Sequence, residues 1–191
     1  MSYSLNGINH LLITCRSMEE TLPFYQDVLG MKVVATAGGS SQDSKTAKLL
    51  WDKSAGSIDH IPRTKINRLY FLKFGGTQLA IVEIPEWQPE DQRSVFLPLL
   101  WPGAGAPGHP TQVDHLAFGV ESREAVVWFQ NRLREHGVPV SEIEESNGRL
   151  HSIYFYGPNG LPLEIAAFNP DAPPLTTTFR DPDPVPSLKV S

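Results

Sequence analysis

The chain has a single cysteine, Cys15, among its 191 residues. One cysteine excludes an internal disulfide framework and suits a reducing compartment, so we expect a cytoplasmic protein in which Cys15 is a small packing residue. No apolar run approaches the roughly 20 residues that span a membrane, and the N-terminus lacks the apolar core of a signal peptide. These absences predict no membrane partner.

Clusters of basic residues are also missing. The chain carries 16 Lys and Arg against 21 Asp and Glu, a net charge of −5, and no stripe of alternating basic and aromatic residues. Nucleic-acid binding is therefore disfavoured. With 40% hydrophobic and 19% charged residues, the composition is ordinary for a globular protein. A chain of this length can bury a substantial core as one domain or two small ones.

The most informative feature present is an internal repeat. Residues 8–14 (Ile-Asn-His-Leu-Leu-Ile-Thr) and 113–119 (Val-Asp-His-Leu-Ala-Phe-Gly) are both apolar strands with a central histidine, His10 and His115. The same shift of 105 residues aligns two further pairs: Ser17 with Ser122, and Phe24 with Phe129. A repeat of strand, helix and strand indicates one supersecondary unit used twice, which could bring the two histidines together.

Each unit continues with elements that end in glycine-rich turns. After the strand at 8–14, Ser17 opens a helix with capping-box spacing and Gly30 ends it. The remaining predicted elements of the first unit are a strand at 31–36, a polar loop at 37–64, and a hairpin of strands 66–74 and 77–84. Those of the second unit are a strand from 113, a helix at 122–136, a strand at 138–144, and a hairpin within 151–168.

This organisation divides the chain into four parts. Residues 1–84 form a first βαβββ module, and 85–112 form a linker rich in proline and aromatic residues that packs on the domain. Residues 113–168 form a second βαβββ module, and 169–191 form a Pro-rich tail that is either disordered or an arm over a neighbouring subunit. The fold class is α+β, with the modules pairing into a curved mixed sheet.

Glu164 is a lone carboxylate within an apolar strand, where burying an unpaired charge is costly. It is either a solvated or salt-bridged edge residue, or a ligand of a cation. Two histidines and one carboxylate on paired sheets would make a divalent-metal site. Glu83 is the other candidate, but Gly76 corresponds to Gly160, which places Ala80 opposite Glu164 and turns Glu83 toward the helix unless a bulge intervenes.

Four segments carry a resemblance to a known family. They are Ile8-Asn9-His10, residues 24–30 (Phe-Tyr-Gln-Asp-Val-Leu-Gly), residues 113–118, and residues 152–164 with the Gly-Pro-Asn-Gly turn before Glu164. Together they resemble the vicinal oxygen chelate superfamily of glyoxalase I, extradiol dioxygenases, fosfomycin-resistance thiol transferases and bleomycin-resistance proteins. The resemblance covers about residues 8–168, apart from the loop and the linker.

The resemblance implies a metal held by His10, His115 and Glu164, with Fe(II) favoured and Mn(II), Zn(II) or Ni(II) as alternatives. Glyoxalase I has a fourth ligand at the position of Ala80, so this chain departs from it. Extradiol dioxygenases and fosfomycin transferases share the three-ligand pattern and a substrate-contacting tyrosine where Tyr154 stands. The resemblance therefore favours an Fe(II)-dependent extradiol-type dioxygenase acting on a small catecholic or related aromatic substrate.

Several alternatives stay open beside that reading. The family's acid-base histidine corresponds to Glu145, so His151 is the nearest substitute, although strand alternation points it away from Tyr154. Tyr156 either lines the pocket or packs in the core, and His60 is either exposed or part of a closing loop. The other activities are a glyoxalase-like isomerase, a thiol transferase, or a non-catalytic ligand-binding protein. The family also implies a homodimer.

Overall fold

The computed structural model describes residues 8–38, 68–88, 94, 98–103, 113–146 and 148–172. The first half contains β1 (His10–Cys15), α1 (Met18–Pro23), η1 (Phe24–Val28), β2 (Lys32–Gly38), β3 (Arg68–Phe74) and β4 (Thr77–Glu83). The second half contains η2 (Pro98–Leu100), β5 (Leu116–Gly119), α3 (Arg123–Glu135), β6 (Glu144–Ser146), β7 (Leu150–Tyr156), η3 (Pro158–Gly160) and β8 (Pro162–Phe168). His60, most of the expected polar loop and most of the tail lie outside the described residues.

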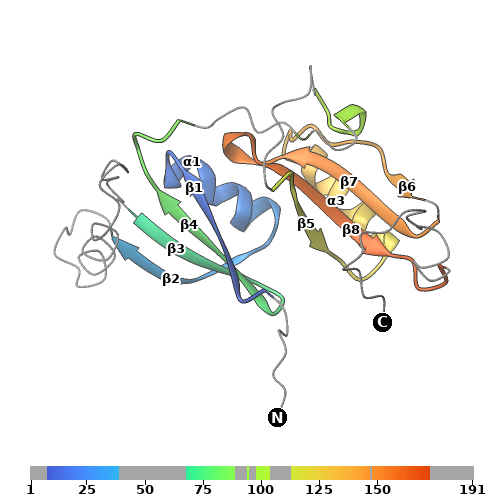
Figure 1. The fold of residues 1–191 in the computed structure, drawn as a ribbon, viewed down its shortest axis with the longest axis horizontal. Coiled ribbons are helices and arrows are strands. Elements are labelled where there is room, and N and C mark those ends of the chain that lie inside the picture. The colour runs from blue at the N-terminus through green and yellow to red at the C-terminus, as the bar shows by residue number, and fades with distance from the viewer. Residues whose placement is uncertain are drawn as a thin grey trace, which may run out of the picture.

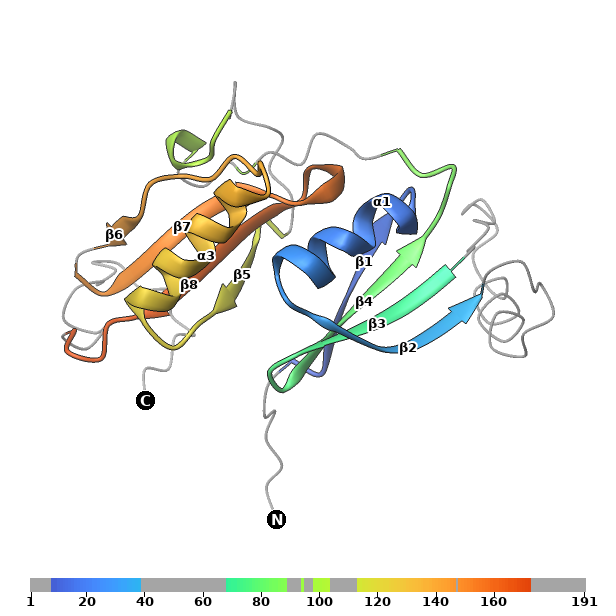
Figure 2. The ribbon, with the colours of Figure 1, turned by 180° about the vertical axis from the view of Figure 1, so that it is seen from behind.

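The strands form two four-stranded mixed sheets with the same topology, in the orders β1-β4-β3-β2 and β5-β8-β7-β6. The edge strands β1 and β5 run parallel to their neighbours β4 and β8, and the other neighbouring strands are antiparallel. Each sheet carries its own helix on one face, so that Figure 2 shows α1 and α3 in front of their sheets and Figure 1 shows the sheets from the other side. The expected α+β fold of two βαβββ modules is confirmed.

Local chemistry explains how the helix of the first module begins and changes. The Ser17 hydroxyl accepts a hydrogen bond from the Glu20 amide at 3.2 Å, as the capping spacing predicted. Pro23 has no amide hydrogen and cannot continue the α-helical pattern, and the next turn widens into the π-helix η1. Gly30 and Gly137 follow the two helices with φ of 74° and 71°, a conformation that glycine adopts without strain.

The strand expected at 138–144 differs from the observed one. Only Val140 forms a bridge there, to Phe155, and the paired strand β6 begins at Glu144. Pro139 has no amide hydrogen for a ladder. Ser141 instead donates its amide to the Tyr154 carbonyl and accepts the Tyr154 amide on its hydroxyl, both at 2.9 Å. A side chain thus replaces part of the expected ladder.

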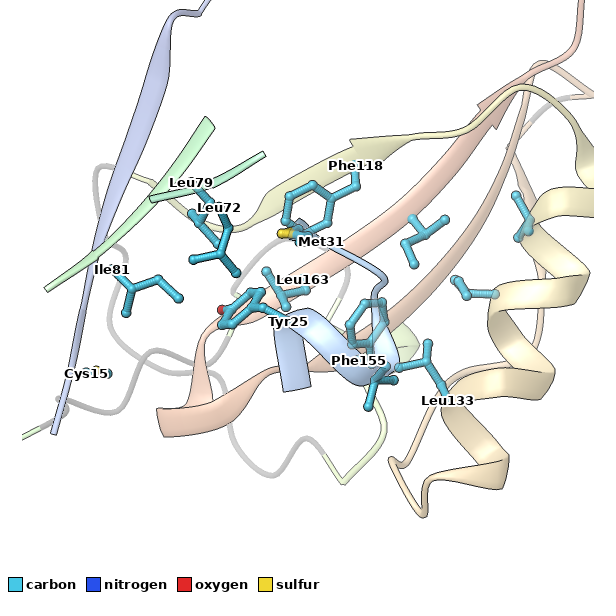
Figure 3. Packing of buried hydrophobic residues seen from close by; sticks show 14 of the residues in the cluster. Cys15, Tyr25, Met31, Leu72, Leu79, Ile81, Phe118, Leu133, Phe155 and Leu163 are labelled. Atoms are coloured by element: carbon cyan, nitrogen blue, oxygen red, sulfur yellow. The ribbon is translucent and has the colours of Figure 1, made fainter. Parts of the chain in front are cut away.

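One apolar core runs through both modules (Figure 3). Tyr25, Leu72 and Leu79 of the first module share it with Phe155 and Leu163 of the second, and all five are fully buried. Among the described residues, two aromatic pairs cross between the modules, with ring centroids 6.3 Å apart for Phe24 and Phe155 and 5.2 Å apart for Phe74 and Phe118. The modules therefore pack through their helix-side elements, and the opposite faces of the sheets are left to carry a site.

The end of η1 is also held by a charged side chain of the second module. Arg132 of α3 donates from Nε to the Val28 carbonyl at 2.7 Å and from Nη2 to the Asp27 carbonyl. Carbonyls at a helix end lack partners within the helix, so a guanidinium is a favourable cap for them. This contact helps to set the orientation of one module against the other.

Two smaller expectations can be compared with the structure. Cys15 is fully buried at the end of β1, where burial raises the pKa of its thiol, as expected for a packing residue. Among the described residues, no helix is both long enough and apolar enough to cross a membrane.

Candidate metal centre

Glu164 lies at the middle of β8, on the face of the second sheet that is turned away from α3. It pairs in register with Ala117 of β5 and Tyr154 of β7. Residues in register share a face, so Tyr154 points to the same side as Glu164. His115 directly precedes β5, two residues before Ala117, and its side chain reaches the same place. The second module thus assembles three of the predicted site residues.

His115 and Glu164 are in direct contact, with 3.0 Å between Nε2 and Oε2. The Glu164 contact is the main cause that raises the pKa of His115, against the effect of partial burial. Burial alone would raise the pKa of Glu164, but His115, with the Ser152 and Tyr154 hydroxyls, lowers it overall. Without a metal the pair is therefore stabilised as imidazolium and carboxylate, and an ion would take the place of the proton on Nε2.

The other nitrogen of the His115 ring is also occupied. Nδ1 lies 2.9 Å from Oδ2 of Asp114, and the buried Ser94 donates its hydroxyl to the same carboxylate oxygen. Metal-binding histidines commonly donate one ring N–H to a carboxylate, which orients the ring and leaves the other nitrogen for the ion. The direction of Nε2 toward Glu164 fits this arrangement.

Aromatic rings surround the pair. Trp101, which directly follows η2, is only 3% exposed. The centroid of its ring lies 5.6 Å from that of His115, 5.1 Å from that of Tyr154 and 5.4 Å from that of Tyr156. Burial, followed by the Glu164 charge, raises the pKa of Tyr154, so its hydroxyl remains protonated at neutral pH. The His115–Glu164 pair is thus flanked by aromatic rings, with the hydroxyls of Tyr154 and Ser152 as nearby donors.

His10 does not join this pair within the chain. It is exposed at the start of β1, where its Nδ1 lies 2.9 Å from Oδ1 of Asn9. Within the ranges that the structure describes, no three His, Cys, Asp or Glu side chains are grouped so that they could hold a metal ion. Imidazole and carboxylate are suitable donors for Fe(II), Mn(II), Zn(II) or Ni(II). The residues present therefore fit a metal, but one chain supplies only two of the three predicted ligands at one place.

Glu83 is turned away from the site. Its Oε2 accepts a hydrogen bond from the Met18 amide at 2.6 Å and lies 3.6 Å from Nη1 of Arg68, and the residue is 4% exposed. Ala80 pairs with Leu12, two residues after His10, as Glu164 pairs with Ala117, two residues after His115. The register therefore confirms that Ala80 is the counterpart of Glu164 and that Glu83 serves the helix.

His151 lies on the other face of β7 from Tyr154. It pairs with Glu145 and Ala167, and its Nδ1 lies 3.7 Å from Oε1 of Glu145. Glu145 itself pairs with Arg123 at 3.1 Å on the protein surface. Neither residue stands beside Tyr154, so the structure does not bring the predicted acid-base histidine to the pair.

The sequence analysis did not assign a role at the site to three residues that the structure places around His115: Ser94, Trp101 and Asp114. Ser94 and Trp101 belong to the linker. Its aromatic residues predicted that it packs on the domain, but no sequence pattern indicated that it packs against His115. Asp114 carries a signal that could have been used, because the two histidines follow Asn9 and Asp114 at corresponding positions of the repeat. A repeated Asx-His pair points to a shared way of holding the ring.

Comparisons with known proteins bear on the fold that carries this site. Three solved structures match with 16–17% identity over 88% of this chain. A glyoxylase/bleomycin resistance protein/dioxygenase domain from Frankia sp. EAN1pec is 96% covered with a TM-score of 0.59, and a glyoxalase/dioxygenase from Nostoc punctiforme is 99% covered with a TM-score of 0.56. A genomically encoded fosfomycin resistance protein from Listeria monocytogenes is 95% covered with a TM-score of 0.54.

At these identities the likeness is one of fold. No curated protein matches the sequence. The family described as the Glyoxalase/Bleomycin resistance protein/Dioxygenase superfamily matches residues 7–165, which is most of the chain. Nearly all of both modules falls within that match, together with His10, His115 and Glu164. The chain belongs to the glyoxalase/bleomycin resistance protein/dioxygenase superfamily.

Proposed function

We propose that the protein is a metal-dependent enzyme whose divalent ion is held by His10, His115 and Glu164. The observation that carries this proposal is the 3.0 Å approach of the His115 and Glu164 donor atoms on a buried sheet face. A carboxylate with 5% exposure would be costly there without a cation, and the imidazolium serves that purpose in the metal-free protein. The repeat supplies the second histidine.

We propose further that two chains complete each site as a homodimer. His10 is exposed on β1 between two exposed apolar residues, Ile8 at 62% and Leu12 at 57%. Exposed apolar side chains that lie together on one strand face are a feature of protein interaction surfaces. The His115–Glu164 pair of one chain would then receive His10 of the partner subunit.

For the reaction, we propose extradiol-type ring cleavage of a small catecholic substrate with Fe(II) as the metal. Two histidines and one carboxylate on one side of the ion suit Fe(II), which would supply the electron transfer between the substrate and dioxygen. The rings of Trp101, Tyr154 and Tyr156 offer planar surfaces that fit an aromatic substrate. The protonated Tyr154 hydroxyl would donate a hydrogen bond to a substrate oxygen, and Trp101 would exclude water from the pair.

A second activity is supported by one specific observation. In the part of the chain that the structure describes, His151 and Glu145 do not lie beside Tyr154, so the acid-base group of a dioxygenase has no clear candidate there. Addition of a thiol to an epoxide needs the same ligand set and a Lewis acid, without that histidine. A glyoxalase-like isomerisation is less well supported, because Ala80 stands where the additional glutamate would be.

The proposals are tested in sequence on anaerobically purified protein. Metal analysis of wild type, His115→Ala and Glu164→Ala comes first, and full occupancy in His115→Ala would refute the site. Oxygen uptake with Fe(II)-loaded protein across a panel of catechols follows, with yellow ring-opened products as the expected result. If no catechol consumes oxygen and Mn(II)-loaded protein joins a thiol to an epoxide, the transferase replaces the dioxygenase.

The shared site has its own test by subunit mixing. His10→Ala and His115→Ala are purified separately, and both should be deficient in metal. Subunits exchanged between them should recover part of the metal content, because a mixed dimer contains one site with all three ligands. No recovery despite verified exchange, or a strictly monomeric mass by light scattering at micromolar concentration, would contradict the shared site. Metal bound in full by both variants on their own would place the ion at other residues and contradict the proposed ligands.

A further inference from the structure

The two histidines are held in the same way by the residue that precedes each of them. Nδ1 of His10 lies 2.9 Å from Oδ1 of Asn9, and Nδ1 of His115 lies 2.9 Å from Oδ2 of Asp114. The two contacts stand at corresponding positions of the repeat, one in each module. An identical contact in two independent modules indicates a shared requirement on the ring.

We propose that Asn9 and Asp114 are positioning residues that fix the tautomer of the two histidines and present Nε2 of each to the metal, with Asp114 as the stronger of the two. This inference rests on the proposed metal site. An amide oxygen and a carboxylate oxygen only accept hydrogen bonds, so Nδ1 carries the hydrogen in both rings. At His10, Nε2 then keeps its lone pair, which is the form that a metal binds; at His115, the ion would displace the Nε2 proton that faces Glu164.

The Nδ1–H form has to be imposed by the protein. If Nε2 carried the hydrogen instead, the Nδ1 lone pair would face an acceptor oxygen, which is repulsive at 2.9 Å. In the metal-free protein His115 can be protonated at both nitrogens, toward Asp114 and toward Glu164. When an ion replaces the Nε2 proton, the contact with Asp114 retains the proton on Nδ1 and keeps the ring in place.

The two positioning residues differ in charge and in whether a further hydrogen bond holds them in place. Asp114 is an anion, and the Ser94 hydroxyl, 1% exposed, donates to the oxygen that also faces His115. Asn9 is neutral and exposed. Charged acceptors form hydrogen bonds about twice as strong as neutral ones. His115 is therefore the firmly held ligand, and Ser94 connects it to the linker between the modules.

The repeat provides a matched exchange experiment. Asp114→Asn gives the second module the neutral acceptor of the first, and Asn9→Asp gives the first module the charged acceptor of the second. Outer partners of metal ligands typically change metal affinity by about 10- to 100-fold. We expect a loss of that size for Asp114→Ala, a smaller loss for Asp114→Asn, and a gain for Asn9→Asp. Glu142→Gln is the control, because Glu142 is exposed and its only ion pair among the described residues is with Arg134.

Two measurements are made on each variant. Competition against a chromogenic chelator gives the affinity for Mn(II) and Zn(II), and ¹⁵N chemical shifts of labelled histidine in the metal-free protein report which ring nitrogen carries the hydrogen. The expected spectrum shows the Nδ1–H form at His10 and its loss in Asn9→Ala. If Asp114→Ala does not fold, the two exchange variants, which keep an acceptor at both positions, decide the result.

The outcomes separate this inference from the metal proposal. Unchanged affinities in Asp114→Asn and Asn9→Asp, with wild type binding metal, would overturn the positioning role and leave the site intact. A wild type that binds no metal would overturn the proposed function, and the ¹⁵N shifts would still test the tautomer. Nε2–H rings at both histidines would overturn the inference whatever the metal result.

Discussion

Glu83 in β4 and Glu164 in β8 are both buried carboxylates, and replacing Glu83 tests whether it has a structural role or binds metal. A metal site with four protein ligands would need Glu83 as the fourth ligand, whereas in the structure Glu83 binds the first residue of α1. Its Oε2 accepts from the Met18 amide at 2.6 Å, and Arg68 lies 3.6 Å away. We therefore expect Glu83→Ala to lower the stability of the protein and to leave its metal stoichiometry unchanged.

The size of the loss follows from the contacts. A hydrogen bond to a charged group contributes roughly 1.5–3 kcal/mol, and the Met18 amide would be left without its acceptor in a buried place. The Arg68 contact adds less than about 1 kcal/mol, because that side chain is partly exposed and also pairs with Glu19. Together these give about 3 kcal/mol, or roughly 6–12 °C in Tm for a chain of this length.

The assay is thermal unfolding beside metal analysis on the same preparations. Glu83→Gln keeps an acceptor oxygen and should lose about half as much stability, since a neutral hydrogen bond is roughly half as strong. Glu19→Gln is the control, because Glu19 pairs with the same Arg68 at 2.7 Å but is 77% exposed, and its removal should cost less than about 1 kcal/mol. Metal loss in Glu83→Ala with an unchanged Tm would refute the reasoning.

Three further predictions concern the pair and the core. In metal-free protein, the stability lost in Glu164→Gln should be largest between pH 4.5 and 6.5, the ordinary pKa values of the two groups. The raised pKa of His115 adds stability that is lost as pH rises, and the lowered pKa of Glu164 adds stability that is lost as pH falls; a loss independent of pH in urea titrations would contradict this. The Tyr25 hydroxyl is buried without a hydrogen-bond partner among the described residues, so Tyr25→Phe should leave the protein as stable or up to about 2 kcal/mol more stable by urea unfolding. Gly157→Ala would place a Cβ 2.8 Å from Cδ1 of Leu163 and should cost about 1–3 kcal/mol by the same measurement, and an unchanged midpoint would show that the core yields there.

The repeat was readable from the sequence because its signals are local. Strand alternation, the Ser17 cap and the glycines at 30 and 137 each depend on a few neighbouring residues, and the structure has them as expected. Counting from the hairpin glycines was enough to place Ala80 opposite Glu164, because the register of a tight hairpin follows from its turn. The strand expected at 138–144 was misplaced, since Pro139 and the Ser141 side chain changed the ladder.

The candidate site was only partly readable for the same reason. His115, Glu164 and Tyr154 belong to one module, so short-range register brings them together. By itself the sequence determined two βαβββ modules and the face on which each of these residues lies, and it left Glu83 outside the site unless a bulge intervened, which the strand register of the structure shows it does not.

Only the tertiary structure decided how the modules and the linker are arranged around that site. The modules pack through Phe24, Phe155 and the Arg132 cap, which leaves His10 apart from the pair within one chain. Ser94 and Trp101 reach His115 from the linker by contacts that no periodicity encodes. Side-chain packing between distant segments has no repeat in the sequence, because it depends on shape and hydrogen bonding that exist only once the chain has folded.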